Sequence, residues 1–255
     1  MASILKGKVA LVTGGSRNIG RETALAIANQ GGDVVITYRS QKEAADEVVA
    51  EMQSKGARAR ALQVDFDGTS ELDDLVASFL QVLDDWGRSD FDILVNNAGE
   101  LRLGTFDRTS ESDLDAMYNV NFKSPYFLTQ KLAERIAEGG RIINLGSGTA
   151  RIAFGPLISY GPLKAALQSL TLYWASYFGA KGITANAVAP GGLDDDFNQT
   201  LFDVMPQARD YITSNTAIGR IGVPSDVAGV IGFLCAPEAS FVNGATINID
   251  GGYHL

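Results

Sequence analysis

The sequence predicts an α/β fold with a doubly wound, seven-stranded parallel sheet that is covered by helices on both faces. Short runs rich in β-branched residues alternate along the chain with longer amphipathic stretches, as they do in βαβ units. A glycine-rich segment follows the first of these runs directly. The length of 255 residues, with 45% hydrophobic and 20% charged residues, suits one domain, 1–255, with a sizeable core.

Each element of this fold can be placed on the chain. The strands are expected at 9–13, 34–38, 59–64, 93–96, 141–145, 183–188 and 246–249. The helical stretches lie near 20–30, 42–55, 70–85, 112–138, 159–180 and 225–234. Within them, 160–178 is apolar nearly all round, which requires burial on more than one side, and another subunit could supply part of that burial.

One segment breaks the alternation. Residues 191–220 have no strand pattern and are expected to form a loop with a short helix near 199–210. In an α/β scaffold such a segment is the best candidate for a mobile lid over a substrate.

Composition excludes several classes of function. The chain has 21 basic and 30 acidic residues, and its net charge of −9 repels a phosphate backbone, so we expect no nucleic-acid partner. No apolar run reaches the roughly 18 to 20 residues that a membrane helix needs, so no membrane partner is expected. Because the first residues lack the long apolar stretch of a signal peptide, we expect a cytoplasmic protein.

The chain has one cysteine, Cys235, and one histidine, His254. This pair excludes a zinc site built from several His and Cys ligands, and no metal site is predicted. Cys235 lies in an apolar run and is expected in the core, whereas His254 is interpreted as an ordinary tail residue. Any catalysis must therefore use other side chains.

The glycine-rich segment, residues 13–20, reads T-G-G-S-R-N-I-G and leads into a helix. Glycines let a backbone turn tightly and approach a pyrophosphate, and the helix behind them offers free N–H groups to an anion. The alternative is a tight turn without a ligand. Here the chain resembles the short-chain dehydrogenase/reductase family, whose usual turn is T-G-x-x-x-G-x-G. The resemblance implies a Rossmann fold that binds a dinucleotide through Gly14, Ser16, Arg17, Asn18, Ile19 and Gly20.

Position 18 departs from that family pattern. Asn is the non-glycine residue that best tolerates a left-handed backbone, so we expect Asn18 to preserve the turn with little strain.

The end of the second strand favours NADPH/NADP+ over NAD. An acidic residue at this point bonds the ribose of NAD and would repel the 2′-phosphate of NADP, but the chain has Tyr38 there. Arg39 and Arg17 can clamp a phosphate, and Ser40 adds a hydroxyl group. The alternative is that both arginines are solvated surface charges.

Three further segments are assigned to the cofactor by the family resemblance. Asp65, beside Phe66, matches the position that bonds the adenine amino group. Residues 96–99 match the N-N-A-G segment, so Asn96, Ala98 and Gly99 are expected to line the cofactor. Pro190 and Gly191 match the turn beside the nicotinamide.

The pattern Y-x-x-x-K occurs three times, at Tyr38, Tyr160 and Tyr177. Only Tyr160 opens a predicted helix, 13 residues after Ser147, which ends the fifth strand. An i, i+4 pair shares a helix face, so Lys164 is expected beside Tyr160. Positive charge from Lys164 and the oxidised nicotinamide should favour the phenolate. Tyr160 is therefore predicted to be the acid in reduction or the base in oxidation, with Ser147 holding the carbonyl oxygen.

Two neighbouring features complete this picture. By the resemblance, Asn121 is the fourth catalytic residue and holds a water molecule that links Lys164 to solvent. Pro162 is tolerated in the first turn of a helix, which supports a helix start near Ser159.

The loop after the sixth strand departs from the family. A threonine that usually bonds the nicotinamide carboxamide falls at Asp195, within the acidic run 194–196. We interpret the run as a solvated loop or a helix N-terminus, with a cationic substrate as the alternative; a magnesium site lacks a supporting pattern. The resemblance extends over 8–252, to a terminal D-G-G segment.

The leading hypothesis is an NADPH-dependent oxidoreductase that reduces a small-molecule carbonyl compound, similar to the 3-oxoacyl-acyl-carrier-protein reductases. The alternatives are an NADP-dependent alcohol, sugar or steroid dehydrogenase that acts oxidatively, and a non-catalytic NADP-binding regulator. Phe154, Leu157, Phe197 and Phe202 suggest an apolar substrate pocket, with ordinary loop packing as the alternative. The family implies a homotetramer.

Overall fold

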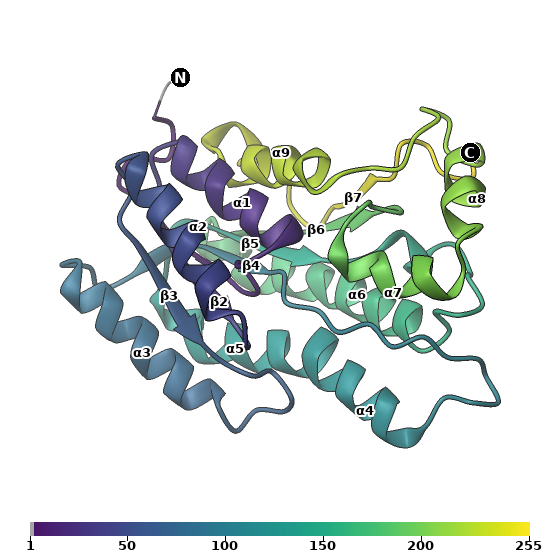
Figure 1. Cartoon of the computed structure of the whole chain (residues 1–255). Coiled ribbons are helices and arrows are strands. Elements are labelled where there is room, and N and C mark those ends of the chain that lie inside the picture. Colours follow the sequence, from purple (N-terminus) through teal and green to yellow (C-terminus); the bar gives the residue numbers. More distant parts are fainter. Residues whose placement is uncertain (1–2) are drawn as a thin grey trace.

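The computed structural model describes residues 3–255, which form one seven-stranded sheet in the order β3-β2-β1-β4-β5-β6-β7 (Figure 1). Every neighbouring pair of strands is parallel, so the predicted fold class is confirmed. The strands are β1 (Val9–Val12), β2 (Asp33–Tyr38), β3 (Ala59–Gln63), β4 (Phe91–Asn96), β5 (Ile136–Leu145), β6 (Thr184–Pro190) and β7 (Thr246–Ile249).

Helices cover both faces of the sheet because its central strands are apolar on both sides. In β1, Ala10 and Val12 enter one hydrophobic cluster, while Val9 and Leu11 enter the other, as the alternation of side chains in a strand requires. The first cluster lies under α1 (Asn18–Asn29), α2 (Lys42–Ser54) and α9 (Pro224–Cys235). The second lies under α3 (Leu72–Asp85), α5 (Ser124–Leu132) and α6 (Tyr160–Phe178).

The strand order creates the crevice in which a ligand can bind. The chain moves outward from β1 to β3 and then returns to place β4 on the other side of β1. At such a switch point the connections leave in opposite directions and open a crevice at the carboxyl ends of the strands. The glycine-rich turn at the end of β1 lies at this point.

The predicted helix 112–138 is wrong in its continuity and in its end. The chain forms α4 (Glu111–Tyr118), a π-helical turn (Asn119–Lys123) and α5, and β5 already begins at Ile136. Ile136 is buried and pairs with Phe91 at the start of β4. This tertiary pairing overrides the local preference of the Ile-Ala-Glu segment for a helix.

The segment 191–220 contains two helices, α7 (Asp196–Val204) and α8 (Ala208–Ser214), instead of the one expected near 199–210. The break falls at Met205 and Pro206. Proline lacks the N–H of a helical hydrogen bond and pushes the residue before it out of the helical region, and Met205 has φ −133° and ψ 74°. The two helices lie beside the sheet at its β6 and β7 side (Figure 1).

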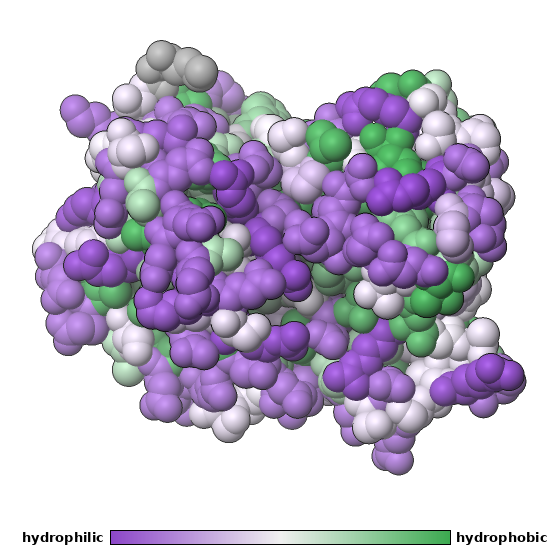
Figure 2. All heavy atoms as spheres, in the orientation of Figure 1, coloured by the Kyte–Doolittle hydropathy of each residue, from purple (hydrophilic) through white to green (hydrophobic). Residues whose placement is uncertain are grey.

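The surface differs from one side to the other. Figure 2 shows apolar residues gathered on the side of α7 and α8, whereas the side of α2 and α3 is mainly hydrophilic. Within residues 3–255, no helix is both long and apolar enough to cross a bilayer.

Candidate active site

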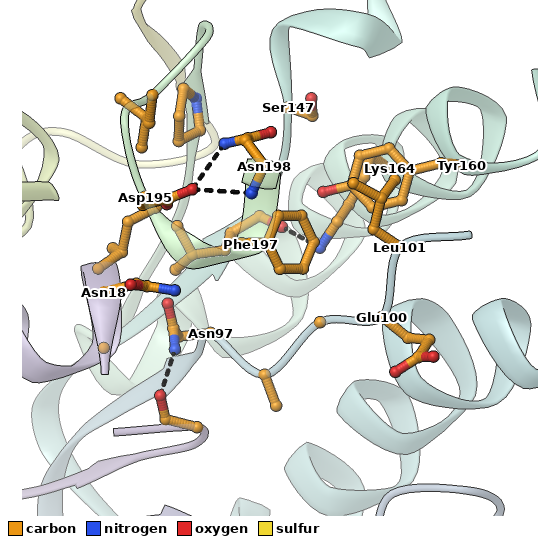
Figure 3. Close-up of a pocket in the computed structure, with 18 of the residues that line it drawn as sticks. Asn18, Asn97, Glu100, Leu101, Ser147, Tyr160, Lys164, Asp195, Phe197 and Asn198 are labelled. Atoms are coloured by element: carbon orange, nitrogen blue, oxygen red, sulfur yellow. Dashed lines mark hydrogen bonds between the residues drawn. The ribbon is translucent and has the colours of Figure 1, made fainter. Parts of the chain in front are cut away.

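A cavity of about 300 Å³ lies at the carboxyl ends of the strands and joins the glycine-rich turn to the start of α6. Most of the residues that the sequence assigned to a cofactor meet there, although they come from distant parts of the chain (Figure 3). The lining includes Gly14, Ser16, Arg17, Asn18, Ile19, Gly20, Tyr38, Arg39, Ser40, Asp65, Phe66, Ala98, Gly99, Tyr160, Lys164, Pro190 and Gly191.

The glycine-rich turn, residues 13–20, forms a concave backbone surface, called the cradle below, in which side chains at the glycine positions would collide with neighbouring atoms. A Cβ atom on Gly20 would lie 2.1 Å from the Gly14 carbonyl oxygen, and one on Gly15 would lie 2.6 Å from Ile36. Asn18 has φ 51°, so the expectation that Asn takes the left-handed position is confirmed. Among residues 3–255 no side chain caps the N-terminus of α1, which leaves its first N–H groups available to an anion. These features fit the pyrophosphate of a dinucleotide.

The cradle is held from the side by Asn97. Its Nδ2 atom donates hydrogen bonds to the carbonyl oxygens of Thr13 and Gly14, at 2.8 and 3.0 Å. Asn96, in contrast, lies outside the pocket. Its side chain points into the protein and donates hydrogen bonds to Thr129 and Asn144. The expectation that Asn96 lines the cofactor is therefore wrong. The sequence reasoning missed the role of Asn97, although it was the second Asn of the same segment.

One end of the pocket carries positive charge. Arg17, Arg39 and Ser40 line it, and Tyr38 stands where an acidic residue would repel a phosphate. The guanidinium of Arg39 lies 3.3 Å from Glu100 Oε2, and the side chain of Arg39 is 58% exposed. Since an arginine offers five N–H donors, Arg39 retains donors for a phosphate while it contacts Glu100.

The other end of the pocket carries three of the four predicted catalytic residues. Ser147 follows β5, and its hydroxyl group lies 2.8 Å from Thr149 Oγ1. Tyr160 is the first residue of α6, as the position of Pro162 predicted. One turn later, Lys164 Nζ lies 5.5 Å from the centre of the Tyr160 ring and donates to the Leu145 carbonyl oxygen at 2.8 Å. All three line the cavity.

The other two Y-x-x-x-K pairs do not form such a site. Lys42 is exposed and contacts Asp46 of its own helix, although Tyr38 lines the pocket. Tyr177 is 75% exposed on α6 and lies outside the cavity, and Lys181 pairs with Glu134. Of the three Y-x-x-x-K pairs, only Tyr160 and Lys164 lie together in the cavity, which agrees with the prediction.

Burial controls the charge of the catalytic pair. Tyr160 and Lys164 are only 7% and 3% exposed. Burial, followed by the nearby charge of Asp195, raises the pKa of Tyr160, and burial lowers the pKa of Lys164 to about 7. The expectation that Lys164 and the oxidised nicotinamide together favour the phenolate concerns the complex with the cofactor and stays a prediction; in the protein alone, desolvation favours the phenol. Tyr160 is a neutral phenol, which is the form that can donate a proton.

Asn121 lies behind the pocket and does not line it. It is fully buried in the π-helical turn, where Nδ2 donates to the carbonyl oxygens of Glu100 and Met117 at 2.8 and 2.9 Å. Such turns occur often at functional sites. In this structure Asn121 fixes the backbone of Glu100, which lines the cavity.

The acidic run begins α7, so its interpretation as a helix N-terminus is confirmed. Asp195 is the N-cap residue and accepts a hydrogen bond from the backbone N–H of Asn198. Asp195 also lines the cavity, as does Phe197, whose ring centre lies 6.2 Å from that of Tyr160. This placement of Asp195 could not be read from sequence, since it depends on how α7 packs.

The substrate end of the cavity is apolar. Phe154, Leu157 and Phe197 line it, as expected, but Phe202 does not. Phe202 is buried, and the guanidinium of Arg209 lies 4.2 Å from the centre of its ring. Further apolar residues line this end without belonging to a motif: Leu101, Ile152, Leu201, Ile212 and Tyr253. Leu201 and Ile212 belong to the expected lid, 191–220, whereas Tyr253 was not anticipated.

Comparisons with known proteins agree with this geometry. Residues 14–254 match the family model described as enoyl-(acyl carrier protein) reductase. A probable tetrahydroxynaphthalene reductase from Zymoseptoria tritici is 35% identical, over 98% of this chain and 95% of its own length. A short-chain dehydrogenase/reductase from Pestalotiopsis microspora is also 35% identical, over 97% of this chain and 96% of its own.

Solved structures give the same result. The angucycline C-6 ketoreductase LanV with bound NADP aligns with a TM-score of 0.94 and 34% identity, covering 100% of this chain and 98% of its own. A short-chain dehydrogenase from Burkholderia cenocepacia in complex with NADP aligns with a TM-score of 0.89 and 38% identity, covering 98% and 99%. From the family model, the full-length relatives and the shared fold, this chain belongs to the short-chain dehydrogenase/reductase family.

Proposed function

We propose that this protein is an NADPH-dependent reductase that converts a ketone into an alcohol, with Tyr160 as the proton donor. The observation that carries the proposal is the single pocket that joins an anion cradle, two arginines and a buried neutral tyrosine. A purely structural glycine turn would need neither the arginines nor the tyrosine. The NADP-bound relatives LanV and the Burkholderia dehydrogenase support the choice of cofactor.

The residues of the pocket fit NADPH, which supplies the hydride when it is bound. The N–H groups at the start of α1 would hold the pyrophosphate, and Arg17, Arg39 and Ser40 would hold the 2′-phosphate. Asp65 lines the same end of the pocket and is assigned to the adenine. Pro190 and Gly191 line the same pocket as Tyr160, and the family resemblance assigns them to the nicotinamide.

The chain's own residues supply the acid and its support. Ser147 turns its hydroxyl group from Thr149 to the carbonyl oxygen and holds that oxygen in place. Tyr160 donates its proton to the same oxygen as the alcohol forms. Lys164, fixed by the Leu145 carbonyl, lies beside the ring, where its positive charge favours the phenolate that remains. Asn121 positions the Glu100 backbone at the rim of the pocket.

The substrate that fits best is a flat, largely apolar ketone. Phe154, Leu157 and Phe197 line the substrate end and can pack against an aromatic ring system. Two kinds of relative support this inference. One group carries the name hydroxynaphthalene reductase-like protein, and LanV has been solved with bound NADP and rabelomycin. We therefore propose a polycyclic aromatic ketone as the substrate class, with α7 and α8 as the lid.

The protein is proposed to act as a homotetramer. Leu172, Tyr173 and Tyr177 project from α6 with 56%, 71% and 75% exposure, which is unusual for large apolar side chains. A second copy that covers this face would supply the burial that the apolar sequence of α6 requires. A cytoplasmic location stays a prediction that suits an enzyme supplied with NADPH.

The proposal is tested by titrating the protein with NADPH, followed through the fluorescence of its two tryptophans, and then by measuring NADPH consumption with a panel of ketones. The panel should contain naphthols in their keto form, larger polycyclic ketones and short aliphatic ketones. We expect binding, and fastest turnover with the polycyclic compounds. Tight NADPH binding without turnover of any ketone would favour a nucleotide-binding regulator instead.

A further inference from the structure

Three acidic residues begin α7, but only the middle one faces the pocket. Asp194 is exposed and pairs with Arg209 Nη2 at 2.7 Å, and Asp196 is exposed outside the cavity. Asp195 is partly buried and lines the cavity together with Tyr160. Figure 3 shows Asp195 on the segment that faces the helix of Tyr160 and Lys164.

The Asp195 carboxylate is fixed through only one of its oxygens. Oδ1 accepts hydrogen bonds from the Asn198 backbone N–H at 3.0 Å and from Asn198 Nδ2 at 2.8 Å. No residue of 3–255 donates a hydrogen bond to Oδ2. Phe197, the next residue but one, packs against the Tyr160 ring and so holds the start of α7 against the catalytic end of α6. Asp195 therefore presents a free acceptor oxygen to the cavity, and burial, together with the charges of Asp196 and Asp194, raises the pKa of its carboxyl group above the usual value.

This charge acts on the reacting centre. It contributes to the raised pKa of Tyr160, after burial. For a proton and a hydride to reach one carbonyl group, the Tyr160 hydroxyl and the hydride-donating carbon must each lie about 3 to 3.5 Å from it. The nicotinamide ring must therefore lie close to Tyr160. A charge that affects Tyr160 in this partly buried pocket then also affects the nicotinamide ring.

The charge balance of the reaction shows which enzyme-bound state a carboxylate near the nicotinamide stabilises. Reduction moves a hydride, with its electron pair, from NADPH to the carbonyl carbon, and a proton from Tyr160 to the carbonyl oxygen. The phenolate takes a new proton from solvent, and the net change in the site is one positive charge, on the oxidised nicotinamide. A nearby carboxylate stabilises that charge and so favours the enzyme-bound NADP+ and alcohol over the enzyme-bound NADPH and ketone.

We propose that Asp195 biases the reaction on the enzyme towards reduction, because its carboxylate stabilises the bound oxidised nicotinamide relative to bound NADPH, while the overall equilibrium in solution stays unchanged. The inference rests on the proposed function and extends it. It assigns a role to the position at which the family's usual threonine is replaced.

The test compares the affinities for the two forms of the cofactor in wild type, Asp195→Asn and Asp196→Asn, each titrated with NADPH and with NADP+ at pH 8 by calorimetry. Asn is as good an N-cap residue as Asp, so Asp195→Asn keeps the helix start while it removes the charge. We expect it to weaken NADP+ binding about three- to tenfold and to leave NADPH binding nearly unchanged. Asp196→Asn, which removes the same charge one residue away, should leave both affinities unchanged.

The outcomes separate the two proposals. If Asp195→Asn changes the NADP+ to NADPH affinity ratio no more than Asp196→Asn, while the wild type still reduces ketones, the role of Asp195 is overturned and the proposed function stands. If the wild type binds neither cofactor, both are overturned. If it binds both but reduces no ketone, the proposed function fails, and with it the claim about direction.

Discussion

Lys164 is the residue whose burial has the clearest energetic consequence. Its side chain is almost completely enclosed, and no carboxylate is paired with it among residues 3–255; its hydrogen bond goes to a backbone carbonyl. Its pKa is lowered from 10.5 to about 7 because burial penalises the ammonium form. In the unfolded chain the same lysine keeps its ordinary pKa.

This difference makes the stability depend on pH in a defined direction. Between about pH 7 and 10.5 the unfolded chain binds a proton at Lys164 that the folded protein does not, so stability rises with pH across that window. Compared with Lys164→Met, the free energy of unfolding of the wild type should rise by at most about 1.4 kcal/mol per pH unit. Urea unfolding without cofactor at several pH values measures it. Lys181→Met, which changes an exposed lysine and keeps Lys164, should show the same pH dependence as the wild type; parallel curves for all three proteins would contradict the account.

Arg39 is expected to decide between the two cofactors. Arg39→Gln removes a charge-assisted hydrogen bond that NADPH can make and NADH cannot, so NADPH affinity should fall about ten- to a hundredfold while NADH affinity stays the same. Fluorescence titration with both cofactors measures the ratio. Arg60→Gln is the matched control, because Arg60 is exposed on β3 and lies outside the pocket. An equal loss for both cofactors would argue against a phosphate contact.

The candidate catalytic side chains that meet in the pocket could be predicted from the sequence, but their charges could not. Tyr160, Ser147 and Lys164 follow from spacing and from the ends of predicted elements. The protonation of Tyr160 could not be predicted in this way, because it depends on desolvation and on Asp195, which reaches the pocket only when α7 packs beside α6.

At the scale of elements, the turn between β1 and α1 depends on the absence of side chains. Gly20→Ala would place a methyl group 2.1 Å from a backbone oxygen, which the turn can accommodate only by opening. We expect NADPH affinity to fall at least roughly tenfold because the N–H groups at the start of α1 would lose their alignment.

Gly229→Ala provides the contrasting variant. A Cβ atom on Gly229 meets nothing within 4 Å, and the residue is exposed within α9. This change should raise the free energy of unfolding by about 0.5–1 kcal/mol, since alanine favours a helix over glycine, and should leave NADPH binding intact. Calorimetric titration and urea unfolding of both variants measure the two effects. Normal NADPH binding by Gly20→Ala would show that the cradle is not the cofactor site.

Elements were predicted well where the hydrophobic pattern is strong and poorly where distant contacts decide. All seven strands were found because β-branched runs are distinct from amphipathic stretches. The π-helical turn at Asn121 was missed; within it Asn121 bonds the Glu100 backbone, a tertiary contact that a helical sequence pattern does not encode. The break at Pro206 was available in the sequence and was overlooked.

At the scale of the whole molecule, the exposed face of α6 predicts association. Tyr173→Lys combined with Tyr177→Lys places two charges in the face that a second copy would cover, which is costly to bury. Light scattering should give four times the chain mass of 27.1 kDa for the wild type and a smaller particle for the variant. A monomeric wild type would remove the basis for the homotetramer.

Most residues of the cofactor half of the pocket could be predicted, because strand order and local motifs place them; Asn96 and Asn97 were the exceptions. The substrate half could not, because Leu101, Ile212 and Tyr253 meet there from three separate segments without a shared pattern. The substrate class therefore depends on the shape of the folded cavity.

The most direct test of the account is the rate of NADPH oxidation by Tyr160→Phe with the best ketone of the panel. The variant keeps the ring that packs against Phe197 and loses only the hydroxyl group that donates the proton. We predict that kcat falls about 10²- to 10⁴-fold while the dissociation constant of NADPH is unchanged. A variant that reduces the ketone at the wild-type rate would show that Tyr160 is not the acid.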